Sequence, residues 1–315
     1  MPSHLSFTGR WPAASPQADW RRQVAAWNKL LAQCACNPKR RHVHALRSLT
    51  LRLGATVEFC LLNSVQNPAA ARVLQRWNQE GRKLRRALRP VRDADVCLAR
   101  LQELGAALEE NPRSGLASAP CYRRGKKKLQ RRLQQRRKLA AARLLKWIKA
   151  RGKRLKRLGR EMAEVVKNES LPGNLSGTPE ALRIMAGLAG QFPRLDHANL
   201  HAYRKALKPA LYLSEISSVA DPQAMRLAAA LRKTHLAAGE WRDWKTLAEE
   251  AGHAGKNSLA PLLEMMAEQS QRYAIALIRR LRLHRVKNLT AAGMPVAAIT
   301  PCAAGMGRDP SLRIK

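Results

Sequence analysis

The sequence predicts an all-α protein that contains an internal duplication. Ala, Leu, Arg, Gln and Lys dominate its 315 residues, and these residue types favour helices. Alternating β-branched runs, which would indicate strands, are absent from the sequence. A short pattern that starts with His and continues with Arg occurs at residues 44–47 and again at residues 201–208. Such internal similarity predicts two related helical units.

The two copies extend beyond this pattern. His44 and His201 are 157 residues apart, and each is followed by a Trp-containing basic stretch and then by an Arg-Asp pair. These pairs occupy residues 92–93 and 242–243, which are 150 residues apart. Because the two offsets are nearly equal, the duplicated unit is expected to include both features.

The predicted division of the chain follows from the places where Pro, Gly, Ser and Asn gather. The longest such break, residues 168–177, is predicted to link a first helical half, residues 23–167, to a second half, residues 178–288. Residues 1–22 are assigned to an N-terminal segment. Residues 289–315 are rich in Ala, Gly and Pro and lack helical periodicity, so we predict a poorly ordered tail.

Within the halves, individual residues mark the helix boundaries. A break at Asn67 separates two early helices, and residues 111–120 interrupt the chain again. Thr178 and Asp221 each place a capping side chain directly before a proline, and each therefore predicts the start of a helix.

Each motif helix combines an apolar stripe with a basic stripe. At 100° per residue, the second copy aligns His with several cations and Tyr beside a stripe of Leu and Tyr, and the first copy repeats this with fewer charges. One face of each helix can therefore be buried while the next presents cations. The candidate binding residues on these stripes are His44, Arg47, Arg52, His201, Arg204, Lys205, Lys208 and Tyr212.

The formal net charge of +37 predicts a strongly anionic partner. Charge is densest in residues 123–160, where Leu and Ile recur at three- and four-residue steps and no Asp or Glu occurs before Glu161. Such a helix repels itself, so we expect a polyanion to compensate it. The alternatives are a solvated face that keeps the protein soluble, or a calmodulin-target or membrane-surface helix, which would need an apolar face that the bundle already uses.

Several other classes of protein are disfavoured. No apolar run reaches the roughly 18 residues of a membrane span, and the first residues show no secretory signal. The six cysteines have no paired zinc-type spacing, so we predict a reducing cytoplasm, no metal and no cofactor. Phosphate-loop, His-Glu-x-x-His and Gly-x-Ser-x-Gly motifs are absent, which predicts a binding protein without catalysis.

The His-x-x-Arg helix, residues 89–98 and the helix at residues 201–215 together resemble the CHAD family of His-containing α-helical domains, over roughly residues 23 to 285. The resemblance implies two four-helix bundles related by a pseudo-twofold axis. It also implies that basic residues line a central groove or pore that binds inorganic polyphosphate, and it suggests association with polyphosphate granules.

Carried over residue by residue, the resemblance covers the eight motif residues named above and Arg92, which matches the family's Arg before Asp. We add neighbouring cations as candidates for polyphosphate binding, namely Arg82, Lys83, Lys128, Arg132 and Arg136. The sequence departs from the family where further Arg is usual, at Leu51, Gly54, Pro209 and Leu211, and Pro209 is expected to kink its helix. The basic residues 123–160 either compensate for these losses or move the binding surface.

The main alternative partner is nucleic acid, because the same cations would contact its phosphates. Single-strand binders usually expose stacking rings, yet aromatic residues make up only 4% of this chain. Trp20, Trp27, Trp77 and Trp147 have helical spacings that suit a core. No helix-turn-helix or zinc-finger signature supports a duplex binder.

Overall fold

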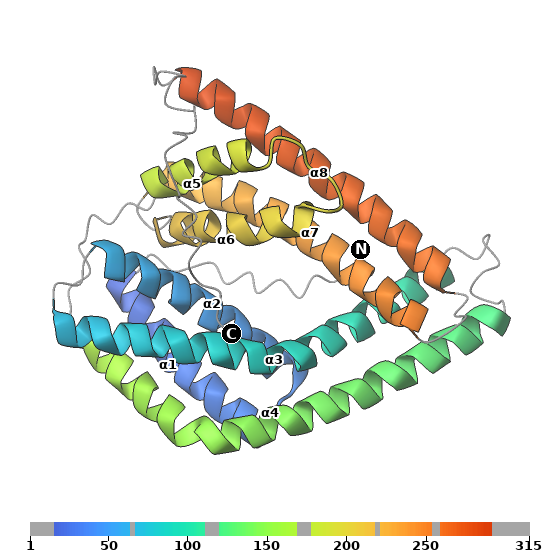
Figure 1. The fold of residues 1–315 in the computed structure, drawn as a ribbon, viewed down its shortest axis with the longest axis horizontal. Coiled ribbons are helices and arrows are strands. Elements are labelled where there is room, and N and C mark those ends of the chain that lie inside the picture. Colours follow the sequence, from blue (N-terminus) through green and yellow to red (C-terminus); the bar gives the residue numbers. More distant parts are fainter. Residues whose placement is uncertain are drawn as a thin grey trace, which may run out of the picture.

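The computed structural model describes residues 16–63, 67–110, 120–168, 178–217, 221–253 and 259–291. Within these ranges the regular structure is α-helical and no strand occurs, as the sequence predicts (Figure 1). The described ranges leave out most of the predicted N-terminal segment, linker and tail, namely residues 1–15, 169–177 and 292–315. The helices are α1 (Pro16–Cys36), α2 (Arg40–Asn63), α3 (Pro68–Glu109), α4 (Pro120–Asn168), α5 (Thr178–Gln191), α6 (Leu200–Ser217), α7 (Pro222–His253) and α8 (Ala260–Ala291).

Short polar side chains lie at the starts of three of these helices. The Asn67 side chain accepts hydrogen bonds from the backbone N–H groups of Ala69 and Ala70, at 2.9 and 3.5 Å. At α7, the Asp221 carboxylate accepts from the Gln223 N–H at 2.7 Å. It also accepts from the Thr178 hydroxyl at 2.9 Å, so the starts of α5 and α7 are linked to each other.

The first four helices share one apolar core. Helix α1 packs against α2 and α4, and α3 packs against α2 and α4. Trp20, Trp27 and Trp77 are buried in this core, and the rings of Trp27 and Trp77 meet edge-on with centroids 5.5 Å apart. Trp27 Nε1 donates to the Thr50 hydroxyl at 2.9 Å, which satisfies the indole N–H in the interior. Trp20 belongs to this core as well, although the sequence placed it before the first helical half.

The last four helices share a second core. Helix α6 packs on α5 and α7, and α7 packs on α8. Phe59 of α2 belongs to this second core, so one side chain of the first half is buried in the other half. The helix pairs α2 with α6 and α3 with α7 also contact each other directly.

A third core lies where the far ends of four long helices meet, at the right of Figure 1. It combines Leu101 of α3 and Leu129 of α4 with Leu247 of α7 and Leu263 of α8. Because both halves contribute to this cluster, it holds the long helices together away from the middle of the molecule.

Two prolines lie inside helices that continue past them. Pro90 lies midway along α3, which changes direction near its middle in Figure 1, as expected where a backbone N–H is missing. The residues after this bend include Arg92, which pairs with Asp243 of α7. Pro209 lies within α6, which is helical from Leu200 to Ser217.

Candidate anion-binding site

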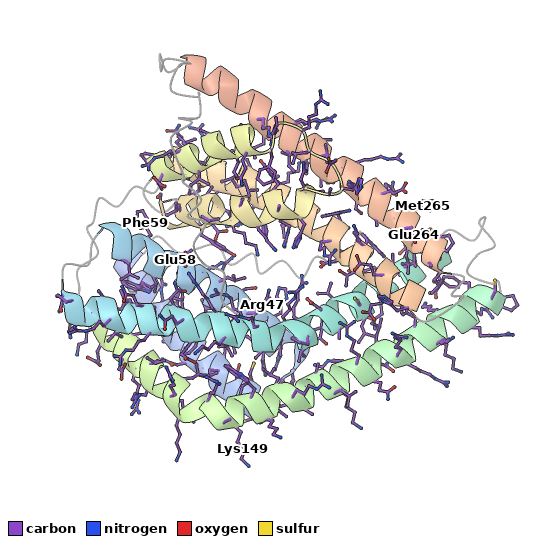
Figure 2. All side chains as sticks on the ribbon, viewed as in Figure 1. Arg47, Glu58, Phe59, Lys149, Glu264 and Met265 are labelled. Atoms are coloured by element: carbon purple, nitrogen blue, oxygen red, sulfur yellow. The ribbon has the colours of Figure 1, made fainter. Side chains whose placement is uncertain are left out.

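Cations from three helices gather where the two halves meet. They are all partly buried, and they comprise Arg47 of α2, Arg85 and Arg92 of α3, and Arg204 and Lys208 of α6. We call these five residues the central cluster. Figure 2 shows Arg47 between α3 and the pair formed by α6 and α7.

Lys208 interacts electrostatically with all four other members of this cluster. Burial, and then the positive charges of the four arginines of the cluster, lower the pKa of Lys208 to about 8. Burial followed by the charge of Arg92 likewise lowers the pKa of Arg47 to about 10. An anion placed among these groups would relieve their mutual repulsion, so the arrangement favours binding of negative charge.

Backbone carbonyls hold the guanidinium groups in place. Arg47 Nη1 donates to the Arg85 carbonyl at 2.7 Å, and Arg85 Nη1 donates to the Thr50 carbonyl at 3.2 Å. Arg204 Nε donates to the His235 carbonyl at 3.4 Å. Since a guanidinium carries five N–H groups, each of these arginines keeps donors for a ligand.

Two carboxylates orient Arg92. Its Nη1 lies 3.1 Å from Asp93 Oδ1, and its Nη2 lies 3.3 Å from Asp243 Oδ1. Although burial opposes it, the pKa of Arg92 is raised by Asp243 and Asp93. Burial raises the pKa of Asp243 in spite of Arg92 and Arg100. Because Asp243 belongs to α7, this ion pair fixes an arginine of the first half against the second half.

Two glycines leave room for the cluster arginines. A Cβ at Gly239 would lie 3.2 Å from Arg204 Nη2, and a Cβ at Gly54 would lie 3.2 Å from Arg85 Nη1. Gly54 is one of the positions where the sequence departs from the family's usual Arg. Its lack of a side chain allows Arg85 of α3 to approach α2.

We predict that Gly239→Ala weakens anion binding several-fold, because the new methyl group displaces the Arg204 guanidinium by a few tenths of an ångström. Gly252→Ala on the same helix is the matched control, since nothing lies within 4 Å of its Cβ position. Both changes gain roughly 1 kcal/mol of helix propensity at most. Titration of both variants with polyphosphate checks this, and equal affinities would contradict the proposed role of Gly239.

Three histidines flank the cluster, and the pKa of each is lowered. Burial, and then Lys205 and Arg242, lower the pKa of His201 to about 4. The pKa of His235, which the sequence analysis did not single out, is lowered well below its usual value by burial and Arg204. His44 is exposed, yet partial desolvation and then Arg92 and Arg40 lower its pKa. A nearby anion would raise all three pKa values.

Tyr212 and Arg52 lie at one side of the cluster. Burial, and then the charge of Glu215, raise the pKa of Tyr212 to about 12, so its phenol stays protonated and can donate a hydrogen bond. Arg52 Nε lies 3.6 Å from Glu215 Oε2, which links α2 to α6.

The duplication extends to ion pairs that the sequence analysis overlooked. Glu58 pairs with Arg82 at 2.7 Å, and Glu215 pairs with Arg232 at 2.7 Å. The two glutamates are 157 residues apart and the two arginines are 150 apart, the same offsets that relate the His and Arg-Asp features. The hydrogen bond from Arg47 to the Arg85 carbonyl also has a counterpart, the bond from Arg204 to the His235 carbonyl. The two donors are 157 residues apart and the two acceptors are 150 apart. Helix α6 is therefore the counterpart of α2, and α7 that of α3.

Several predicted site residues lie away from the central cluster. Arg82 is exposed beside Glu58 at the cluster's edge, and Lys205 is exposed on α6 near His201. Lys83 pairs with Glu80 at 2.8 Å, on the side of α3 that faces α4.

The three candidates on α4 belong to the far end of the molecule. Arg132 Nη1 donates to the His253 carbonyl at 2.9 Å, Arg136 pairs with Glu250, and Lys128 is exposed. The contacts with Glu250 and His253 hold α4 against the end of α7. The structure does not bring these residues to the central cluster.

Within the described residues, no helix is long and apolar enough to cross a membrane. The same part of the chain contains no group of three or more His, Cys, Asp or Glu that could hold a metal ion.

Fold and site together define an all-α protein with a duplicated helical unit and a cluster of cations where the two copies meet. The CHAD domain family matches residues 18–249, and the chain belongs to this family. Among solved structures, PptA from Streptomyces chartreusis is similar, with 16% sequence identity and a TM-score of 0.58 over 87% of this chain and 100% of that chain. At this identity the similarity shows the fold alone. A search of curated proteins finds no match.

Proposed function

We propose that this protein binds inorganic polyphosphate, without catalysis, in a groove or pore lined by the central cluster. In this proposal α1–α4 and α5–α8 act as two four-helix bundles related by a pseudo-twofold axis. The observation that carries it is the gathering of four arginines and Lys208, all partly buried, where the two halves meet, and burial together with these arginines lowers the pKa of Lys208 to about 8. Membership of the CHAD domain family supports the same ligand class.

The chemistry of the cluster suits a linear phosphate chain. Guanidinium groups offer planar forks to phosphate oxygens, and an ammonium adds a point charge. Polyphosphate carries about one charge per phosphate and no bases, so its affinity comes from positioned cations and released counterions. No stacking ring is required, and the buried Trp20, Trp27 and Trp77 leave few aromatic faces for nucleobases. Such binding would place the protein at polyphosphate granules in the cytoplasm.

A competition experiment tests the choice of ligand. Labelled long-chain polyphosphate bound near physiological salt is challenged with equal masses of duplex DNA, RNA, heparin and unlabelled polyphosphate. We expect displacement by polyphosphate alone, because the central cluster offers closely spaced cations and few aromatic faces, which suits a chain without bases or sugars. Equal displacement by every polyanion would reject a fitted site and favour nucleic-acid binding through charge.

We predict that affinity for polyphosphate falls as pH rises above about 8. Lys208 loses its proton there in the free protein, whereas bound phosphate raises its pKa, so binding takes up a proton. Each pH unit above 8 should weaken binding by about tenfold until the pKa of the bound state is reached. Below pH 7 the histidines act in the same direction, since an anion raises their pKa values, and affinity should rise as pH falls.

Isothermal titration at pH 6, 7.5 and 9 measures this dependence. Lys208→Arg is the control, because its charge persists over the whole range and should flatten the alkaline part of the profile. A wild-type profile that stays level between pH 7.5 and 9 would show that Lys208 does not contact the anion.

A further inference from the structure

The long helix α4 carries more cations than its own half of the protein can neutralise. Its charge predicts that an external polyanion compensates this helix, and the structure shows that carboxylates of other helices do part of this. Arg137 forms an ion pair with Asp95 at 2.5 Å. Glu80 forms ion pairs with Arg151 and Arg154 at 3.5 and 3.1 Å. These pairs lie on the sides of α4 that face its neighbours.

The opposite side of α4 is different. Leu129, Leu133, Leu144 and Leu155 are buried and define the inner face of the helix. At 100° per residue, the side away from them carries a row of exposed cations, which we call the outer stripe. The outer stripe consists of Arg131, Lys138, Lys146, Lys149, Lys153 and Lys156.

Within the described parts of the chain, these six cations have no ion-pair partner. Figure 2 shows Lys149 pointing away from the rest of the protein. Residues 131 to 156 span roughly 38 Å along the helix at about 1.5 Å per residue, and α4 bends along its course in Figure 1, so the row is long and curved. Like charges at this density repel each other and favour an anionic ligand along the helix.

The outer stripe is separate from the central cluster. The inner face of α4 packs against α1 and α3, and α4 runs along the outer edge of the molecule in Figure 1. The α4-facing side of α3 carries Glu80 and Lys83, whereas Arg85 and Arg92 belong to the cluster on its other side. A ligand inside the cluster therefore does not cover the outer stripe.

The composition of the stripe favours a thin, flexible polyanion. Five of its six residues are lysines, which act as point charges and demand no planar geometry from the ligand. Trp147 is only partly exposed and lies against Arg151, so it offers no open stacking surface. A flexible phosphate chain can follow the whole row around the bend of α4, whereas a rigid duplex would touch this curved helix over a short arc only. A membrane surface would call for an apolar face, and the apolar face of α4 is already buried.

We propose that the outer stripe is a second polyphosphate-binding surface, which allows one molecule to hold a long chain at two places or to bridge two chains. This inference rests on the proposed function, because it takes polyphosphate as the ligand of the central cluster. Two linked sites bind a long chain more tightly than either site alone, while a chain too short to reach both gains nothing.

The test replaces Lys138, Lys146, Lys149 and Lys153 together with Gln, which removes charge but keeps a good helix former. The control replaces Lys29, Arg72, Lys233 and Arg279 with Gln, four exposed cations scattered over α1, α3, α7 and α8. Both variants lose the same charge, so a difference between them reports the contiguous row. Circular dichroism and thermal melting confirm that both are folded.

The measurement is the slope of log K against log salt concentration, for sodium polyphosphates of about ten and of several hundred phosphates. Loss of four contacts should lower the long-chain slope by about 3, and the scattered control should lower it by less than about 1. Affinity for the short chain should be unchanged in both variants.

Equal slopes for the two variants would overturn the second surface. A loss of duplex DNA binding in the outer-stripe variant, with long-chain polyphosphate binding intact, would also overturn it and assign the stripe to nucleic acid. Failure of the proposed function looks different, because the short chain would then fail to bind the wild-type protein at all. The long-chain slopes would still decide the role of the outer stripe.

Discussion

Replacing Arg204 and Lys208 together with Ala is expected to weaken polyphosphate binding by at least about 100-fold. Each charge-assisted hydrogen bond to a phosphate contributes about 1.5–3 kcal/mol, so two lost contacts account for this change. Both residues belong to the central cluster, and both are partly buried, where solvent screens their charges less than at the surface.

The fold should survive this double substitution. Burial and neighbouring cations lower the pKa of Lys208, so removal of the two groups relieves repulsion in the free protein. The loss of the Arg204 bond to the His235 carbonyl opposes this gain. We expect the melting temperature to stay within a few degrees of the wild-type value.

The matched control is the double variant Lys233→Ala with Arg279→Ala, which removes two exposed cations from α7 and α8. It has the same net charge as the cluster variant and should bind polyphosphate within about threefold of the wild type. Similar losses in the two double variants, measured by titration calorimetry, would mean that net charge and not the cluster determines affinity.

The helices and the duplication could be predicted from the sequence because both leave a local trace. Apolar residues at three- and four-residue steps identify the helices, and the repeated His and Arg identify Arg47 and Arg204 as equivalents. These two residues occupy equivalent places, since each donates to a backbone carbonyl of the next helix. The motif was informative because it is contained within one helix in each half.

Residues on the partner helix could not be recognised in this way. Arg85 has His235 as its counterpart, so the two copies differ in residue type at this position. Successive residues of α3 are turned by 100° around the helix axis. The orientation of α3 therefore decides whether Arg82, Lys83 or Arg85 faces the cluster. The shared offsets of 157 and 150 would have revealed the repeated pairs of Glu58 with Arg82 and Glu215 with Arg232.

Charge density alone placed Lys128, Arg132 and Arg136 in the candidate site. Their actual surroundings depend on the third core, which joins segments of α3, α4, α7 and α8 that are far apart in sequence. Nothing in the local pattern of α4 indicates that the Arg132 and Arg136 side chains meet the end of α7. Only the packing of the long helices shows it.

The buried Glu80 is expected to stabilise the fold through its charge. Its side chain is 2% exposed and pairs with Lys83, Arg151 and Arg154, which joins α3 to the basic helix α4. Glu80→Ala would leave three cations facing one another without a carboxylate. Because these cations are 40–53% exposed and stay solvated, we expect a loss of about 1.5–3 kcal/mol in chemical denaturation, which is the contribution of a hydrogen bond to a charged group.

Glu268→Ala is the matched control, because Glu268 pairs with Arg272 on the exposed side of α8, where such a pair contributes about 0.5 kcal/mol or less. The pKa of Glu80 is lowered by the Lys83 hydrogen bond and by Arg154 in spite of burial, so its contribution is present at neutral pH and is lost as pH falls through the folded-state value. The stability difference between wild type and Glu80→Ala should therefore shrink in acid. A difference that persists unchanged below that pKa would show that Glu80 stabilises the fold by packing and not by its charge.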